Sequence, residues 1–127
     1  MQKLLADVAA FHAATDTPIN TAPYMDPLRL ALRRRLLAEE AQETDKAFAD
    51  YDLVEIADGL VDVIYIAVGT ALELGIPLER VWDEVHRSNM AKVDPETGKV
   101  RKREDGKVLK PDGWVRPDIG GAIYGRG

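Results

Sequence analysis

Two long stretches of helical periodicity, separated by three residues, constrain this 127-residue chain more than any other feature. In the first, over residues 27–49, leucines recur every fourth residue after an Asp-Pro pair that is typical of a helix start. In the second, apolar residues at helical spacing resume at residue 53 and stop at Gly75, a residue type that often ends helices. Because residues 50–52 are too few to separate the two helices, we expect them to form an antiparallel hairpin.

Shorter helices are predicted on either side of this hairpin. Apolar spacing predicts one helix over about residues 2–14 and another over about residues 77–90, the latter opened by a proline. Farther on, prolines, glycines and an Asp-Gly turn at residues 105–106 predict a short hairpin or an irregular arm. The chain is therefore predicted to be all-α: a four-helix domain whose helical body, residues 1–92, continues into a basic C-terminal arm, residues 93–127.

Composition and charge exclude several classes of protein. The chain has no cysteine, so it has neither a disulfide framework nor a thiolate zinc site. No apolar run reaches the roughly 18 residues of a membrane span and no signal peptide is recognisable, so we expect a cytoplasmic protein without membrane contact. Residues 1–91 carry 8 basic and 16 acidic side chains, which argues against nucleic acid binding. Residues 92–127 carry 9 basic and 6 acidic side chains, and this tail either meets an anionic small molecule or is simply solvated.

Carboxylates gather on both helices of the predicted hairpin. One face of the first helix carries Glu39, Glu40 and Glu43, and one face of the second carries Glu55, Asp58 and Asp62. In an antiparallel hairpin, Glu43 lies opposite Asp58, and Glu39 or Glu40 lies opposite Asp62. These charges would repel one another strongly, so a hard divalent cation with oxygen ligands is the expected counter-charge. The alternative is an ordinary solvated acidic face.

The residues that carry this pattern also carry a family resemblance. Glu39-Glu40-x-x-Glu43 followed by an acidic pair on the next helix resembles the MazG-like, all-α nucleoside triphosphate pyrophosphohydrolases, whose pattern is EExxE followed by ExxD. The segments HRSNMAK, residues 86–92, and GKVLKPDGW, residues 106–114, are similar to compact, dUTPase-like members of that group. The resemblance covers about residues 28–119. It implies hydrolysis of a nucleoside triphosphate to a monophosphate and pyrophosphate with Mg²⁺, for which Mn²⁺ substitutes, and with dUTP or another pyrimidine deoxynucleotide as a candidate substrate.

The resemblance also assigns roles to the acidic residues. It implies that Glu40, Glu43 and Asp62 are metal ligands and that Glu39 is the catalytic base, although Glu39 and Glu40 can exchange roles. The sequence departs from the family pattern at Gly59, where the family has a glutamate. Asp58, at i,i+4 from Asp62, is the expected substitute ligand, and Glu55 is the reserve candidate.

Residues near the end of the last predicted helix and in the arm are candidates for substrate binding, namely Asn89, Lys92, Lys107, Lys110 and Trp114. Lysines suit phosphates, and an asparagine suits a sugar or base. Trp114 either stacks on a base or packs the arm onto the body. The run Arg33-Arg34-Arg35 predicts a solvated face with one salt-bridged member, because consecutive residues of a helix diverge by about 100°.

A four-helix unit of this size exposes much of each helix, so a homodimer is expected, as the resemblance also implies. A second interpretation of the whole chain is a non-catalytic helical module that binds a nucleotide or a metal, with the glycine at position 59 as a sign of lost activity. Base and sugar preference depend on pocket contacts that one sequence does not define.

Overall fold

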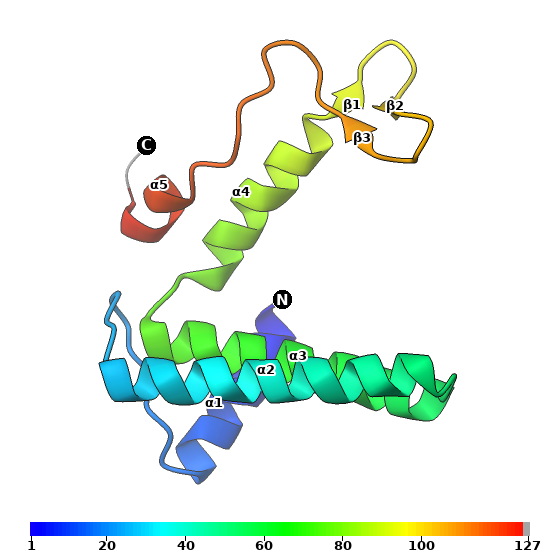
Figure 1. The fold of residues 1–127 in the computed structure, drawn as a ribbon. Helices are drawn as coiled ribbons and strands as arrows, with labels where there is room; N and C mark the ends of the chain where they lie inside the picture. Colours follow the sequence, from blue (N-terminus) through cyan, green and yellow to red (C-terminus); the bar gives the residue numbers. More distant parts are fainter. Residues whose placement is uncertain (126–127) are drawn as a thin grey trace. The chain divides into compact units, whose positions relative to one another are not determined.

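The computed structural model describes residues 1–125 and shows a mostly helical protein (Figure 1). The elements in these residues are α1 (Gln2–Ala14), α2 (Pro27–Ala49), α3 (Leu53–Leu74), α4 (Leu78–Met90), β1 (Val93–Asp94), β2 (Lys99–Lys102), β3 (Val108–Leu109) and α5 (Ile119–Tyr124). They fall into two compact units, Met1–Ile76 and the part that begins at Pro77. The predicted all-α fold class is confirmed, and none of the helices described is both long and apolar enough to span a membrane.

In the first unit, α2 and α3 lie side by side as the predicted hairpin (Figure 1). The carboxylate of Asp26 caps α2 by accepting a hydrogen bond of 3.0 Å from the Leu28 amide. At the start of α3, the carboxylate of Asp52 accepts one of 3.1 Å from the Glu55 amide. Both predicted helix boundaries therefore have a local cause in the sequence, and the short connection fixes the antiparallel direction.

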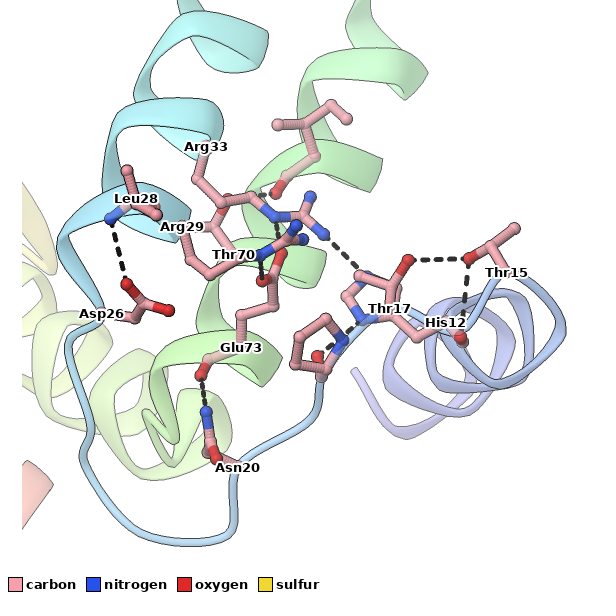
Figure 2. A network of polar contacts seen from close by, with 12 residues as sticks. His12, Thr15, Thr17, Asn20, Asp26, Leu28, Arg29, Arg33, Thr70 and Glu73 are labelled. Atoms are coloured by element: carbon pink, nitrogen blue, oxygen red, sulfur yellow. Dashed lines mark hydrogen bonds and ion pairs between the residues drawn. The ribbon is translucent and has the colours of Figure 1, made fainter.

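The helix α1 packs against α3, and a buried polar network joins it to the hairpin (Figure 2). Glu73 of α3 is 3% exposed and forms ion pairs with two arginines of α2, with Arg29 at 2.7 Å and with Arg33. Arg33 is thus a paired member of the arginine run, but Arg35 also forms a surface pair with Glu39 at 4.0 Å, so the run has two salt-bridged members where one was expected. A buried carboxylate between two guanidinium groups has its charge compensated, which such a group requires.

His12 of α1 completes this network, and its two ring nitrogens have different partners. Its Nε2 lies 3.2 Å from Nη2 of Arg33, and its Nδ1 lies 3.3 Å from the carbonyl oxygen of Pro18. Because a guanidinium only donates hydrogen bonds, Nε2 accepts one and the proton resides on Nδ1. Burial, followed by the positive charge of Arg33, lowers the pKa of His12 below 6.5, although the carbonyl of Pro18 and the charge of Glu73 oppose this shift. The native structure therefore holds a neutral imidazole.

The loop between α1 and α2 is fastened to the end of α3. The side chain of Asn20 donates a hydrogen bond of 2.5 Å to the Glu73 carbonyl, and the amide of Tyr24 donates one of 3.0 Å to the Leu74 carbonyl. At the end of α3, Gly75 has a φ of 67° and would clash with the Ala22 carbonyl if it carried a Cβ. This end of the hairpin is thus closed by backbone contacts as well as by the polar network.

The second unit contains α4, a three-stranded antiparallel sheet in the order β1-β2-β3, and α5. The expected turn at residues 105–106 joins β2 to β3, with Arg101 paired to Leu109. The helix α5 was not predicted, because Gly120 and Gly121 are poor helix formers. Its one local signal is Asp118, whose carboxylate accepts a hydrogen bond of 2.9 Å from the Gly121 amide.

The His12 network predicts a specific pH dependence of stability. The substitution His12→Gln should lower the free energy of unfolding by about 1 to 3 kcal/mol at neutral pH, since buried partners lose their hydrogen bonds. The unfolded chain binds a proton at His12 more readily than the native state, so wild-type stability should fall as the pH drops below 6.5. The difference between wild type and variant, measured by urea unfolding, should therefore shrink with acidification. His86→Gln, on the exposed face of α4, is the control and should leave the curve unchanged.

Candidate functional site

Glu40 occupies the centre of the acidic face that α2 and α3 share. Its side chain is half-buried, and its Oε2 atom is fully buried without a hydrogen-bond partner within the described residues. Buried polar atoms are nearly always satisfied by a partner, so an orphaned carboxylate oxygen requires an explanation. A buried oxygen of this kind is a feature expected of a residue that binds a ligand.

The environment of Glu40 is strongly anionic. Burial and neighbouring carboxylates raise the pKa of Glu40 above 4.5, and the charges responsible, in decreasing order, are those of Asp62, Glu43, Asp58 and Glu39. Two of these neighbours lie on α3 and two on α2, as the antiparallel register predicted. The sequence therefore identified the group of residues that surrounds Glu40.

The members of this acidic group differ in exposure. Asp62 is half-buried, whereas Glu39, Glu43 and Asp58 are exposed. Glu39 lies 4.0 Å from Nε of Arg35, a surface pair that leaves its carboxylate accessible to solvent. Within residues 1–125, no three acidic or histidine side chains converge into a ready-made metal-binding group. The carboxylates are neighbours on two helices, but they do not form a closed cage.

Glu55 and Asp58 differ in what they approach. The charge of Asp58 acts on Glu40. Glu55 instead lines a shallow pocket of about 260 Å³ at the hairpin end, together with Glu43, Lys46 and Asp50. That Asp58, with Glu55 in reserve, replaces the family glutamate as a metal ligand remains a prediction, and the arrangement favours Asp58.

A second pocket lies next to the acidic group, and sequence reasoning did not find it. This pocket of about 320 Å³ is lined by residues of α1, α2 and α3 and of the loop after α1, among them Phe11, Thr15, Leu36, Tyr65 and Ile66. Leu36 is one helical turn from Glu40, and Ile66 is one turn from Asp62. The rings of Phe11 and Tyr65 meet edge to face, with centroids 5.8 Å apart. No local pattern signals this pocket, because its walls come from segments far apart in the sequence.

In the second unit, the predicted substrate-binding residues Lys92, Lys110 and Trp114 form a cluster. Nζ of Lys110 lies 4.5 Å from the centroid of the indole, and Nζ of Lys92 lies 5.4 Å from it. The indole N–H donates a hydrogen bond of 2.8 Å to the carbonyl of the buried Ser88, so Trp114 packs against α4. The packing role that was weighed for Trp114 is therefore present, and two positive charges lie beside the ring.

Of the remaining two predicted residues of the second unit, Asn89 precedes this cluster in the sequence and Lys107 lies between Lys92 and Lys110. The Asn89 side chain accepts a hydrogen bond of 3.1 Å from Lys92 and is exposed at the end of α4. Lys107 is in the turn between β2 and β3, and its carbonyl accepts a hydrogen bond of 2.8 Å from the Arg103 amide. Asn89 is thus linked to the cluster, whereas the backbone of Lys107 holds the turn.

Comparison with known proteins identifies one family. The sequence pattern of phosphoribosyl-ATP pyrophosphohydrolase matches residues 8–89, which include all of α2 and α3 and most of α1 and α4. The match therefore contains Glu40 and every carboxylate that acts on it. A search among curated proteins found no match.

The crowding of negative charge predicts that Glu40 opposes folding at neutral pH. Because the native pKa of Glu40 is raised, its favourable contribution is complete below about 4.5 and is lost as the pH rises through the native value. In the presence of a chelator at about pH 7, Glu40→Gln should therefore raise the melting temperature by a few degrees, an effect typical of about 0.5 to 1 kcal/mol. Glu104→Gln, an exposed change in the arm, is the control. A lower melting temperature for Glu40→Gln would contradict the electrostatic description.

Proposed function

The chain belongs to the phosphoribosyl-ATP pyrophosphohydrolase family, and we propose that it releases pyrophosphate from a nucleoside triphosphate in a Mg²⁺-dependent reaction. This family lies within the MazG-like, all-α nucleoside triphosphate pyrophosphohydrolases. Its members hydrolyse phosphoanhydride bonds, so the chain is a nucleotide pyrophosphohydrolase. This family chemistry favours an enzyme over the non-catalytic module that the sequence also allowed.

One observation carries the proposal of a metal: the buried, unpartnered Oε2 of Glu40 among four further carboxylates. Oxygen donors of this kind suit Mg²⁺ or Mn²⁺, and no cysteine competes for them. Glu40, Glu43, Asp58 and Asp62 would hold the cation. Since Mg²⁺ keeps several waters and takes further ligands from substrate phosphates, a closed protein cage is not required.

In the proposed hydrolysis, the residues of the chain have separate roles. When bound, Mg²⁺ supplies positive charge that offsets the negative charge of the phosphates. Water attacks the α-phosphorus, the bond from this phosphorus to the bridging oxygen breaks, and pyrophosphate leaves with the bonding electron pair. Glu39, which is exposed beside Glu40, accepts the proton of the attacking water, and Glu40 is the second candidate for this role. The products are a nucleoside monophosphate and pyrophosphate.

The pocket of about 320 Å³ beside the acidic group is the proposed place for the nucleoside. The rings of Phe11 and Tyr65 line it, and the hydroxyls of Thr15 and Thr17, 2.8 Å apart, supply polar groups. The name of the matching family indicates phosphoribosyl-ATP as a substrate of that family. The sequence resemblance favours dUTP or another pyrimidine deoxynucleotide. Both kinds of molecule carry the triphosphate that the acidic group would cleave. The proposed substrate is therefore a nucleoside triphosphate, without a choice between the two.

The cluster of Lys92, Lys110 and Trp114 in the second unit is proposed to bind phosphates of a nucleotide. Two ammonium groups lie beside one indole, and neither has a carboxylate partner within the described residues. An anion would compensate this charge. Asn89, which is linked to Lys92, is the proposed contact to a sugar or base, and Lys107 is a further proposed phosphate contact.

Activity measurements test the proposed reaction. Wild-type protein should release pyrophosphate from dUTP, the other common deoxynucleotides, their ribose counterparts or phosphoribosyl-ATP only when Mg²⁺ or Mn²⁺ is present. Glu40→Gln, Glu43→Gln and Asp62→Asn should each lower kcat by at least about 100-fold, as removal of groups from a catalytic site does. Asp45→Asn is the matched control on α2, because Asp45 is exposed and does not act on Glu40. Near wild-type rates in all three site variants would refute the site.

A homodimer is proposed from the exposed apolar face of α3. Leu53, Leu60 and Ile64 follow i, i+7 and i+11, and Val54 and Val61 add a parallel row, with exposed fractions of 47% to 77% among the five. Contiguous apolar surface of this kind marks an interface. A second copy is the simplest occupant, because two such hairpins packed together form a four-helix bundle.

Light scattering after size-exclusion chromatography tests the dimer. The wild type should have the mass of two chains, and the double substitution Val61→Lys with Ile64→Lys should produce a monomer, because charges on an apolar interface are not compensated. Val115→Lys alters an exposed apolar residue of the second unit and should leave the mass unchanged. A monomeric wild type at micromolar concentration would refute the proposal.

A further inference from the structure

The hairpin helices are in close contact where Gly59 of α3 faces Thr44 of α2. A Cβ at position 59 would overlap Oγ1 of Thr44 and would lie 3.0 Å from its Cβ and 3.2 Å from its Cα. Both residues are buried, and Thr44 is only 6% exposed. A methyl group at position 59 would therefore require the Thr44 side chain and the neighbouring backbone to shift.

This contact lies within the acidic group. The hydroxyl of Thr44 donates a hydrogen bond of 2.7 Å to the carbonyl of Glu40, one helical turn earlier. Asp58 directly precedes Gly59, and Asp62 follows it by three residues. The place where the two helices touch is thus bracketed by the carboxylates that surround the buried Oε2 of Glu40.

We infer that Thr44 and Gly59 are a positioning pair, which sets the distance between the carboxylates of α2 and those of α3 so that one cation can bridge them. The inference rests on the proposed function. Metal ligation tolerates errors of only about 0.2 Å in ligand distance, and a shift of about 1 Å can lower a rate by about 100-fold. A methyl group at position 59 would push the helices apart and spread the ligands.

The pair also explains the glycine that departs from the family pattern. Position 59 points into the helix contact, so a glutamate there could not reach a cation while the helices stay this close. The ligands of α3 are then the residues on either side of the contact, Asp58 and Asp62. In this description the glycine enables the site and does not indicate lost activity.

Mn²⁺ binding, measured by calorimetry at a temperature where circular dichroism shows every variant folded, tests the inference without relying on turnover. Gly59→Ala should weaken Mn²⁺ binding by about 10- to 100-fold, the usual effect of disturbing residues that orient metal ligands. Thr44→Ala removes the hydroxyl that the new methyl would overlap. Added to Gly59→Ala, it should bring the affinity back to that of Thr44→Ala alone, which lacks only the hydroxyl hydrogen bond, a rescue that a general loss of stability would not produce.

A second variant tests the hydroxyl of Thr44 even where Gly59→Ala does not fold. Thr44→Val keeps the shape of the side chain but loses the hydrogen bond to Glu40, and it should weaken Mn²⁺ binding by about 2- to 10-fold. Thr70→Val is the matched control, because Thr70 makes the same 2.7 Å bond to the carbonyl four residues earlier on α3 (Figure 2). It should leave Mn²⁺ affinity unchanged.

The outcomes separate this inference from the proposed function. Wild-type protein that does not bind Mn²⁺ would overturn both the metal site and the positioning pair. Wild-type binding that neither Gly59→Ala nor Thr44→Val weakens would overturn the positioning pair alone. Equal weakening by Thr44→Val and Thr70→Val would also overturn it, because the effect would then belong to any lost hydrogen bond of this type.

Discussion

The close antiparallel packing of α2 on α3 is the constraint on which the rest of the first unit depends. A connection of three residues turns the chain back, and a glycine opposite a threonine lets the two helix backbones approach. Because side chains repeat every helical turn, the register fixed by the short connection and by this contact continues along the whole hairpin. The carboxylates near Thr44 and the arginines toward the start of α2 are placed by the same register.

Features that depend on short-range patterns were predictable from the sequence. Asp26 and Asp52 cap their helices, Gly75 ends α3, and the periodicity between these points made the facing of Glu40 and Asp62 predictable. The sequence did not indicate how deeply each of these carboxylates is buried. Whether Glu40 is half-buried while Glu43 is exposed depends on how closely the helices approach, and no periodicity encodes that distance.

Features that join distant segments were missed for a related reason. Glu73 pairs with Arg33 across 40 residues of sequence, and the pocket near Phe11 takes its walls from three helices. A glutamate within an otherwise apolar helix end is ambiguous until its partner is known. The arginine run led us to expect one paired member, because residues 100° apart on a helix cannot all face the same partner, whereas Arg33 and Arg35 are both paired. The partner of Arg33 could be identified only from the tertiary structure.

The two groups of charged residues along the hairpin differ in whether their charges are compensated by partners. At the α1 end, the buried charge of Glu73 meets two guanidinium groups, and Arg33 in turn donates to a neutral histidine, so each member has a partner. In the acidic group, the half-buried Glu40 meets only like charges, and one of its oxygens has no partner in the described residues. A fold gains nothing from such an arrangement by itself, since unpaired buried charge destabilises the native state. The chain tolerates it because the satisfied network and the backbone contacts of the loop fasten the other end of the same helices. At the cation site that we propose, the free energy that these like charges cost in isolation would become affinity when the cation binds.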